Sequence, residues 1–413
     1  MKPTLAELTR VFFRIGVLSF GGPAAQIALM HKELVEKTAW IKDKDFLGAL
    51  SFCILLPGPE AMQLATYTGW KLRSTLGGLI AGLLFVLPGA LVILALAALY
   101  VSFGQLHSVQ TAFVGVKTAV VVILAQALWS LSKRAVPSAA TWVIAAASFG
   151  AIYVFDLSFV VVIAVSALLG ALLLRTIPEP QPQAMRPRFA KILPHLFVWP
   201  LLWAAPIAVV WALDQSFITE IGVFFSKLAV VTFGGAYAVL AYMTQTVSQD
   251  FGWLTTSQMI DALALAETTP GPLILVTEFV ALVSGYQAGG TTLMLAAGAL
   301  ALWCTFIPCF LWIFVAAPYV DRILAQPRLK AALAGISAAV VGVILNLSLW
   351  FAEQTYLQAP KGTPEFEILG ESISLLAVIC TVVAIVALVR VKQSIPPTLL
   401  LCGVTSLVLA NLF

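Results

Sequence analysis

Long apolar runs separated by short polar stretches follow one another from Leu76 to the C-terminus. A helix needs about 20 residues to cross a hydrocarbon layer of roughly 30 Å, and these runs reach that length. Because lipid offers no hydrogen-bond partner to an open backbone, each run is expected to be helical. The pattern predicts an all-α, polytopic membrane protein.

The pattern is present twice in the chain. Residues 14–59 and 227–272 align without a gap at an offset of 213 positions. The matches fall on uncommon residues: Phe20-Gly21-Gly22 with Phe233-Gly234-Gly235, Trp40 with Trp253, and Pro57-Gly58-Pro59 with Pro270-Gly271-Pro272. Further on the offset becomes 220, which pairs Ala119-Val120-Val121 with Ala339-Val340-Val341. The chain is therefore expected to be a duplicated unit.

The domain organisation follows from the repeat. Residues 1–174 form the first half and residues 214–413 the second. Residues 175–194, rich in Pro and Arg, are expected to be a cytoplasmic linker, and residues 195–213 a connecting transmembrane helix without a counterpart. One extra crossing reverses the orientation of the second half. An inverted-topology repeat is common among secondary transporters.

The Gly-Gly and Pro-Gly-Pro motifs are predicted to break the helices that carry them. Proline removes a backbone donor and disfavours helix at the preceding residue. We expect broken helices or re-entrant hairpins whose tips line a cavity, because irregular backbone at membrane depth must be buried in protein or reached by water. The alternative is that all apolar segments cross, six in each half and one between them.

The distribution of basic residues favours the hairpin arrangement. In that arrangement Lys32, Lys37, Lys42 and Lys44 join most other Lys and Arg residues on one side. The positive-inside rule makes that side cytoplasmic. The N-terminus is therefore expected in the cytoplasm.

Composition narrows the classes of function. The 413 residues are 61% hydrophobic and 10% charged, and the net charge of +4 is dispersed among loops. The lipid bilayer is thus an expected partner and nucleic acid is not. The cysteines form no Cys-x-x-Cys pair, and no histidine has a second ligand at helical spacing, so neither a metal nor another cofactor is expected. No nucleophile and base constellation or nucleotide-binding motif is present, which argues against an enzyme.

The broken helices are candidate anion sites, because a helix N-terminus carries a partial positive charge. The predicted substrate-binding amides are those of Gly21, Gly22, Gly58, Gly234, Gly235 and Gly271, with the Thr269 hydroxyl as a further donor. Arg14 and Lys227 occupy equivalent positions within apolar segments, where a cation often marks an ion pathway. The glycines could instead serve close helix packing, and the two cations could extend to the headgroups.

Two carboxylates flank the predicted tips. Glu60 follows the first Pro-Gly-Pro and Glu267 precedes the second. Both are candidates for proton coupling. Alternatively, Glu60 stabilises the N-terminus of the following helix and Glu267 pairs with a base.

At these motifs the chain resembles the chromate ion transporter family in its long two-half form. The resemblance rests on Phe20-Gly21-Gly22-Pro23, Leu56-Pro57-Gly58-Pro59-Glu60-Ala61, Thr232-Phe233-Gly234-Gly235 and Thr269-Pro270-Gly271-Pro272. It implies a multi-pass carrier of the bacterial inner membrane that exports chromate and confers chromate resistance. The second half departs from the first, since Ala236 replaces Pro23 and Leu273 replaces Glu60.

Other functions remain open from the residues alone. Sulfate is also a tetrahedral dianion, so a transporter of sulfate or another oxyanion would carry the same motifs. A passive anion channel could share the hairpins. The sequence likewise leaves the oligomeric state open, a homodimer included.

Overall fold

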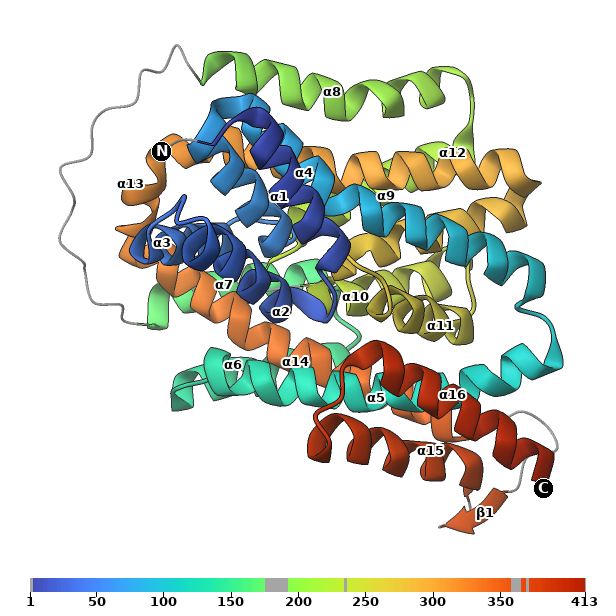
Figure 1. Cartoon of the computed structure of the whole chain (residues 1–413). Helices are drawn as coiled ribbons and strands as arrows, with labels where there is room; N and C mark the ends of the chain where they lie inside the picture. Colours follow the sequence, from blue (N-terminus) through green and yellow to red (C-terminus); the bar gives the residue numbers. More distant parts are fainter. Residues whose placement is uncertain (1–2, 175–191, 234–235, 358–364, 369–370, 413) are drawn as a thin grey trace.

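A computed structural model describes residues 3–174, 192–233, 236–357, 365–368 and 371–412, so most of the predicted linker lies outside the described residues. The helices of the first half are α1 (Leu5–Leu18), α2 (Gly22–His31), the π-helical turn η1 (Lys32–Lys37), α3 (Asp43–Ile54), α4 (Glu60–Phe103), α5 (His107–Ala135), α6 (Ala139–Tyr153) and α7 (Phe159–Leu173). Helix α8 (Leu193–Ala212) follows and lies at the edge of the molecule (Figure 1).

The second half repeats this order with small additions. Its elements are α9 (Ser216–Val231), α10 (Ala236–Gln245), η3 (Thr246–Asp250), α11 (Thr256–Glu267), η4 (Leu273–Leu275), α12 (Val276–Ala316), η5 (Ala317–Tyr319), α13 (Val320–Leu324), α14 (Pro327–Leu357), β1 (Glu365–Ile368), β2 (Glu371–Ser374), α15 (Leu375–Ile385), η6 (Val386–Arg390) and α16 (Ile395–Leu412). Strands β1 and β2 form an antiparallel hairpin between α14 and α15, which the prediction of an all-helical chain did not include.

The helices break at the predicted motifs. Helix α1 ends at Leu18 and α2 begins at Gly22, while α3 ends at Ile54 and α4 begins at Glu60. At 1.5 Å per residue, the 14 residues of α1 and the 12 of α3 extend about 21 and 18 Å, less than the hydrocarbon thickness. Their short lengths agree with the arms of hairpins.

Helix α4 reverses direction within its own length, so that its residues before Arg73 and after Ser74 form two antiparallel arms. Ser74 has a φ of 58° and turns the chain back on itself. A Cβ atom on Gly69 would collide with the carbonyl oxygen of Gly77, so the two arms pack backbone to backbone. In the second half α12 reverses in the same way at Gly290, whose φ is 73°.

The duplication extends to single backbone hydrogen bonds. The Trp40 amide donates to the Leu34 carbonyl over 3.0 Å, and the equivalent Trp253 amide donates to the Val247 carbonyl over the same distance. Each bond closes the loop after a π-helical turn, η1 in the first half and η3 in the second. The structure confirms the two-half repeat.

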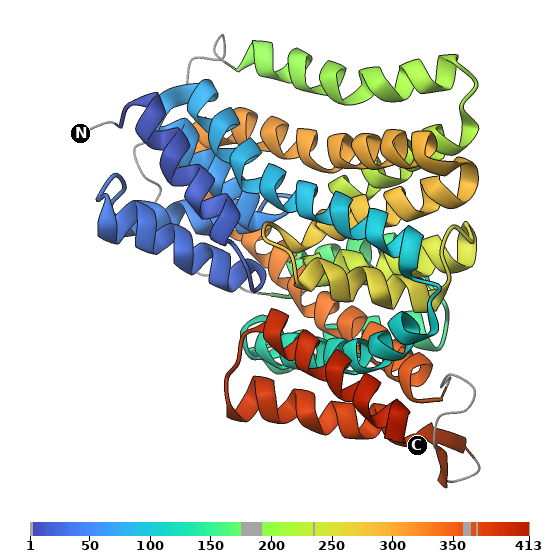
Figure 2. The same ribbon diagram turned by 45° about the vertical axis from the view of Figure 1, so that its right-hand side comes forward.

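The two halves insert their hairpins from opposite ends of the molecule. Helices α1 to α3 enter from the end where the N-terminus lies, and α10 and α11 enter from the other end (Figures 1 and 2). Around them, six described helices are long and apolar enough to cross a membrane, and α6, α7 and α15 with η6 are shorter apolar helices. This is the predicted inverted-topology repeat of a polytopic membrane protein.

Charged side chains gather where the hairpin arms of the first half end away from the tips, at the end of α2 and the start of α3. His31 Nε2 lies 2.7 Å from Asp43 Oδ1, and Lys71 Nζ lies 3.3 Å from Asp45 Oδ2. The hydrogen bond to Asp43 raises the pKa of His31 above its usual value. Because charges are costly in hydrocarbon, this end of the hairpins lies at a membrane surface.

The hairpin arrangement predicts the sidedness of two loops. A cysteine in place of Lys42, in the open end of the first half, should react with an impermeant maleimide from the cytoplasmic face. A cysteine in place of Gln249, an exposed residue of η3 at the open end of the second half, should react from outside. Background labelling should be low, since the native cysteines are all buried.

Lys133→Cys serves as the cytoplasmic control, because it lies on that side whether or not the hairpins cross. Labelling of the Lys42 site from outside would contradict the hairpin arrangement and favour the topology in which all apolar segments cross.

Candidate functional site

The hairpin tips of the two halves are joined by a reciprocal pair of backbone hydrogen bonds. The Gly58 amide donates to the Thr232 carbonyl over 2.7 Å, and the Gly271 amide donates to the Ser19 carbonyl over 2.9 Å. The 213-residue offset converts one bond into the other, because Ser19 corresponds to Thr232 and Gly58 to Gly271. The centre of the molecule is thus a contact between opposed tips.

This contact changes the list of amides that could bind an anion. The Gly58 and Gly271 amides donate to protein carbonyls, so neither is available to a ligand in this structure. Gly21 and Gly22 have φ values of 90° and 79° and end at an open tip, where the first-turn amides of α2 lack intrahelical partners. Gly234 and Gly235 lie outside the described residues.

Two buried glutamines hold the tips in place. Gln26 Nε2 donates to the Gly271 carbonyl over 2.6 Å, and Gln63 Nε2 donates to the Pro57 carbonyl over 2.6 Å. Since a carbonyl oxygen can only accept, the amide orientation of each side chain is fixed. The Oε1 atoms of both glutamines then point away and have no partner among the described residues.

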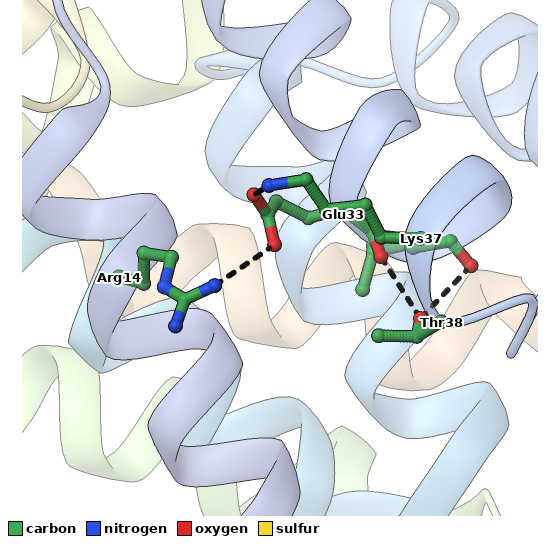
Figure 3. A network of polar contacts seen from close by, with 5 residues as sticks. Arg14, Glu33, Lys37 and Thr38 are labelled. Atoms are coloured by element: carbon green, nitrogen blue, oxygen red, sulfur yellow. Dashed lines mark hydrogen bonds and ion pairs between the residues drawn. The ribbon is translucent and has the colours of Figure 1, made fainter.

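Neither predicted cation has a polar contact with the tips among the described residues, and Figure 3 shows Arg14 directed to Glu33. Arg14 Nη1 lies 3.6 Å from Glu33 Oε2, and Lys37 Nζ lies 2.5 Å from Glu33 Oε1. Lys227 is exposed on α9, on the face that also exposes Val223 and Val230, and has no polar partner among the described residues. Thr246 occupies the place of Glu33 in the second half, so the carboxylate that compensates Arg14 has no equivalent there.

The other predicted site residues lie closer to the tips. Glu267 is 3% exposed and accepts a hydrogen bond from the Tyr237 hydroxyl over 2.7 Å. The Thr269 hydroxyl donates to the Ala266 carbonyl in the last turn of α11 over 2.8 Å. In this rotamer the hydroxyl proton of Thr269 is already in use, while its oxygen can still accept.

Glu60 borders a cavity of about 240 Å³ beside the tip at Gly58. The cavity is lined by Cys53, Ile54, Leu56, Gly58, Glu60, Leu131, Arg134, Ala135 and Ser337. The N-terminus of α4 begins at this cavity, and Arg134, in the last turn of α5, brings a full positive charge to it. The helix N-terminus, the guanidinium and the Ser337 hydroxyl suit an oxyanion, which needs both charge and donors, while the Glu60 carboxylate in the first turn of α4 opposes it. We refer to it as the inner cavity.

Sequence reasoning had not singled out Arg134. It stands beside Lys133 at the end of a long apolar segment, where a basic pair is typical of a cytoplasmic loop. Lys133 matches that interpretation, since its Nζ lies 4.6 Å from the centre of the exposed Trp129 ring. The two neighbours differ in that Arg134 lines the cavity together with residues of α3, α4 and α14 while Lys133 does not, and no local pattern records that difference.

Comparison with known protein families matches the chain to the family described as chromate transporter, over residues 6–171 and again over residues 219–407. Each match falls in one half of the repeat. No solved structure matches the chain.

Curated relatives carry the same description. The chain is 33% identical over 357 residues to the chromate transport protein of Cupriavidus metallidurans, covering 86% of this chain and 85% of the relative. It is 33% identical over 379 residues to the chromate transport protein of Pseudomonas aeruginosa, covering 90% and 86%. A probable chromate transport protein of Synechococcus elongatus is 31% identical over 359 residues, covering 86% and 87%. With two family matches, an inverted repeat and motif-bearing tips in contact at its centre, the chain belongs to the chromate transporter family.

Proposed function

We propose that the protein is a secondary transporter that exports chromate across the bacterial inner membrane and thereby confers chromate resistance. Its N-terminus and the linker of residues 175–194 then lie in the cytoplasm. The observation that carries the proposal is the inner cavity, where Arg134 and the N-terminus of α4 meet at the tip of a hairpin. In the proposed orientation this cavity receives the anion from the cytoplasmic side.

The direction of transport is supported by electrostatics. An inside-negative potential is worth about 2.3 kcal/mol per charge per 100 mV, hence about 4.6 kcal/mol for a dianion leaving the cell. Export can therefore run on the membrane potential alone. Uptake against it would need coupled cations.

A carrier is favoured over a passive channel by the contact between the tips. Ser19 and Thr232 are 1% and 2% exposed, and each carbonyl accepts the bond from the opposed tip. The two backbone hydrogen bonds hold the opposed tips together, which supports a closed centre over an open pore. An anion would cross only after the tips separate, which is the step that gives a carrier its saturable flux.

Three further elements of the proposal come from the sequence motifs. Sulfate, a dianion of the same shape, should share the site. Arg14 and Lys227 are the alternative cations for the site, with the amides at Gly21 and Gly22. The bilayer surrounds the protein, and a homodimer is compatible with its exposed apolar helices.

The transport prediction concerns chromate movement in everted vesicles. Vesicles that contain the protein should accumulate radiolabelled chromate when the potential is positive inside the vesicle, and the flux should saturate with concentration. Unlabelled sulfate should compete. Flux that rises linearly with concentration would instead indicate a channel, and chromate movement into intact cells against the potential would overturn export.

The site prediction concerns Arg134. Replacing it by Gln should weaken chromate binding to the purified protein by about tenfold or more, because a hydrogen bond to a charged group is worth about 1.5–3 kcal/mol. Lys133→Gln is the matched control. It removes the same charge from the same turn of α5 but does not line the cavity, so its affinity should stay near that of the wild type.

The same assay decides between the two locations of the cation. If Arg134→Gln binds chromate normally while Lys227→Met or Arg14→Met does not, the site lies at the predicted cations and not in the inner cavity.

The coupling prediction concerns the two carboxylates of the tips, half-buried Glu60 and buried Glu267. Each Gln variant keeps the shape of the side chain, and the new amide oxygen of the Glu267→Gln variant could still accept from the Tyr237 hydroxyl. At least one variant should transport chromate yet lose its response to an imposed pH gradient. Glu220→Gln, on the exposed face of α9, is the control. An unchanged pH response in both tip variants would exclude these carboxylates as proton carriers.

A further inference from the structure

A second cavity, of about 390 Å³, lies at the other end of α5. We refer to it as the outer cavity. Among its lining residues are Lys117 of α5, Ser257 and Asp261 of α11, and Gln354 and Thr355 of α14. At about 30 Å³ per water molecule, it has room for a tetrahedral oxyanion together with several waters.

Lys117 is the cation of the outer cavity. Its side chain is 17% exposed, although it lies well inside an apolar segment, and a partly buried ammonium at such a position marks a functional site by default. Its Nζ lies 2.5 Å from Ser257 Oγ and 3.2 Å from Asp261 Oδ1. Beside this ion pair, Asp261 Oδ2 accepts a hydrogen bond from the Tyr100 hydroxyl over 2.8 Å.

The donors of the outer cavity extend beyond this ion pair. Helix α11 begins at Thr256, and its N-cap, Thr255, satisfies only the Gln258 amide with its side chain. The remaining first-turn amides have no intrahelical partner, and they add the partial positive charge of a helix N-terminus. The Thr355 hydroxyl is buried, with 5% of the residue exposed, and has no partner among the described residues. An oxyanion could accept from all of these groups.

The two cavities are related by the internal repeat. The 220-residue offset converts Arg134 and Ala135 of the inner cavity into Gln354 and Thr355 of the outer one, and Lys117 into Ser337. The inner cavity contains the C-terminal end of α5 and a residue in the N-terminal half of α14. The outer cavity contains the C-terminal end of α14 and a residue in the N-terminal half of α5. Both cations come from α5, 17 residues apart along its axis, which at 1.5 Å per residue is about 25 Å.

We propose that the outer cavity is a second binding site for a divalent tetrahedral oxyanion, formed by Lys117, the hydroxyls of Ser257 and Thr355 and the N-terminus of α11. The inference rests on the proposed function, since the transported anion is its ligand. Asp261 neutralises Lys117 when the cavity holds no anion, and a bound dianion replaces that carboxylate as the partner of the ammonium. The repeat thus supplies one anion site toward each end of α5.

The test uses sulfate as the probe and a cysteine at Gln110, which is exposed and borders the outer cavity. In right-side-out vesicles, external sulfate should slow the reaction of this cysteine with an impermeant maleimide. The Lys117→Gln background should abolish the protection. Lys133→Gln, which removes a charge from the same helix away from both cavities, should leave it intact.

Asp261 supplies a change in the opposite direction. Asp261→Asn removes the internal competitor for Lys117, so half-maximal protection should need about tenfold less sulfate. Because Lys117→Gln leaves a buried carboxylate unpaired and could impair folding, the double variant Lys117→Gln with Asp261→Asn is measured as well. The double variant removes both charges and should fold. Sulfate should not protect its cysteine from the maleimide.

Two outcomes would overturn the inference while leaving the proposed function intact. One is full sulfate protection in the double variant, and the other is no protection by sulfate in a wild-type background that transports chromate. Reaction of the Gln110 cysteine only from the cytoplasmic face would also overturn the outer placement. By contrast, a wild-type protein that neither transports chromate nor binds it would count against the proposed function itself.

Discussion

The architecture depends on the reciprocal hydrogen bonds between Gly58 and Thr232 and between Gly271 and Ser19. A broken helix leaves backbone groups that lipid cannot satisfy, so a single hairpin tip at membrane depth would be unstable by itself. In this protein each tip supplies the partner that the other lacks. The tip at Pro270 also packs closely against α4. A Cβ atom on Gly89 would collide with the carbonyl oxygen of Pro270.

Much of this arrangement could be predicted from the sequence, because duplication makes rare residues recur at one offset. Pro-Gly-Pro in both halves located the tips, and the single extra segment at residues 195–213 implied the inversion. The loop lysines favoured hairpins, and the short α1 and α3 agree with them. The fold was accessible because each of these features is local or strictly periodic.

The candidate site was predicted less completely, for a physical reason. A basic residue in an apolar segment shows that its charge needs a partner, but not which residue or ligand supplies that partner. Arg14 finds it in Glu33, which the register of η1 brings to the side of α1, whereas the sequence alone placed Arg14 toward an anion. Lys117 finds its partners Ser257 and Asp261 on α11 of the opposite half. Arg134 meets residues of α3 and α4 of its own half and Ser337 of α14, at separations that no pattern along the chain reveals. Glycine amides were predicted as donors without knowledge of the carbonyls that accept from them.

The exchange of α5 and α14 between the two cavities has a consequence for how such a protein can evolve. Two identical copies of the first half, related by a strict twofold axis, would place a lysine beside an arginine in every cavity. Fusion into one chain releases that constraint. With Ser337 and Gln354 where the first half has Lys117 and Arg134, each cavity retains a single cation of its own kind. The two cavities can then carry different side chains, which identical copies of one sequence do not allow.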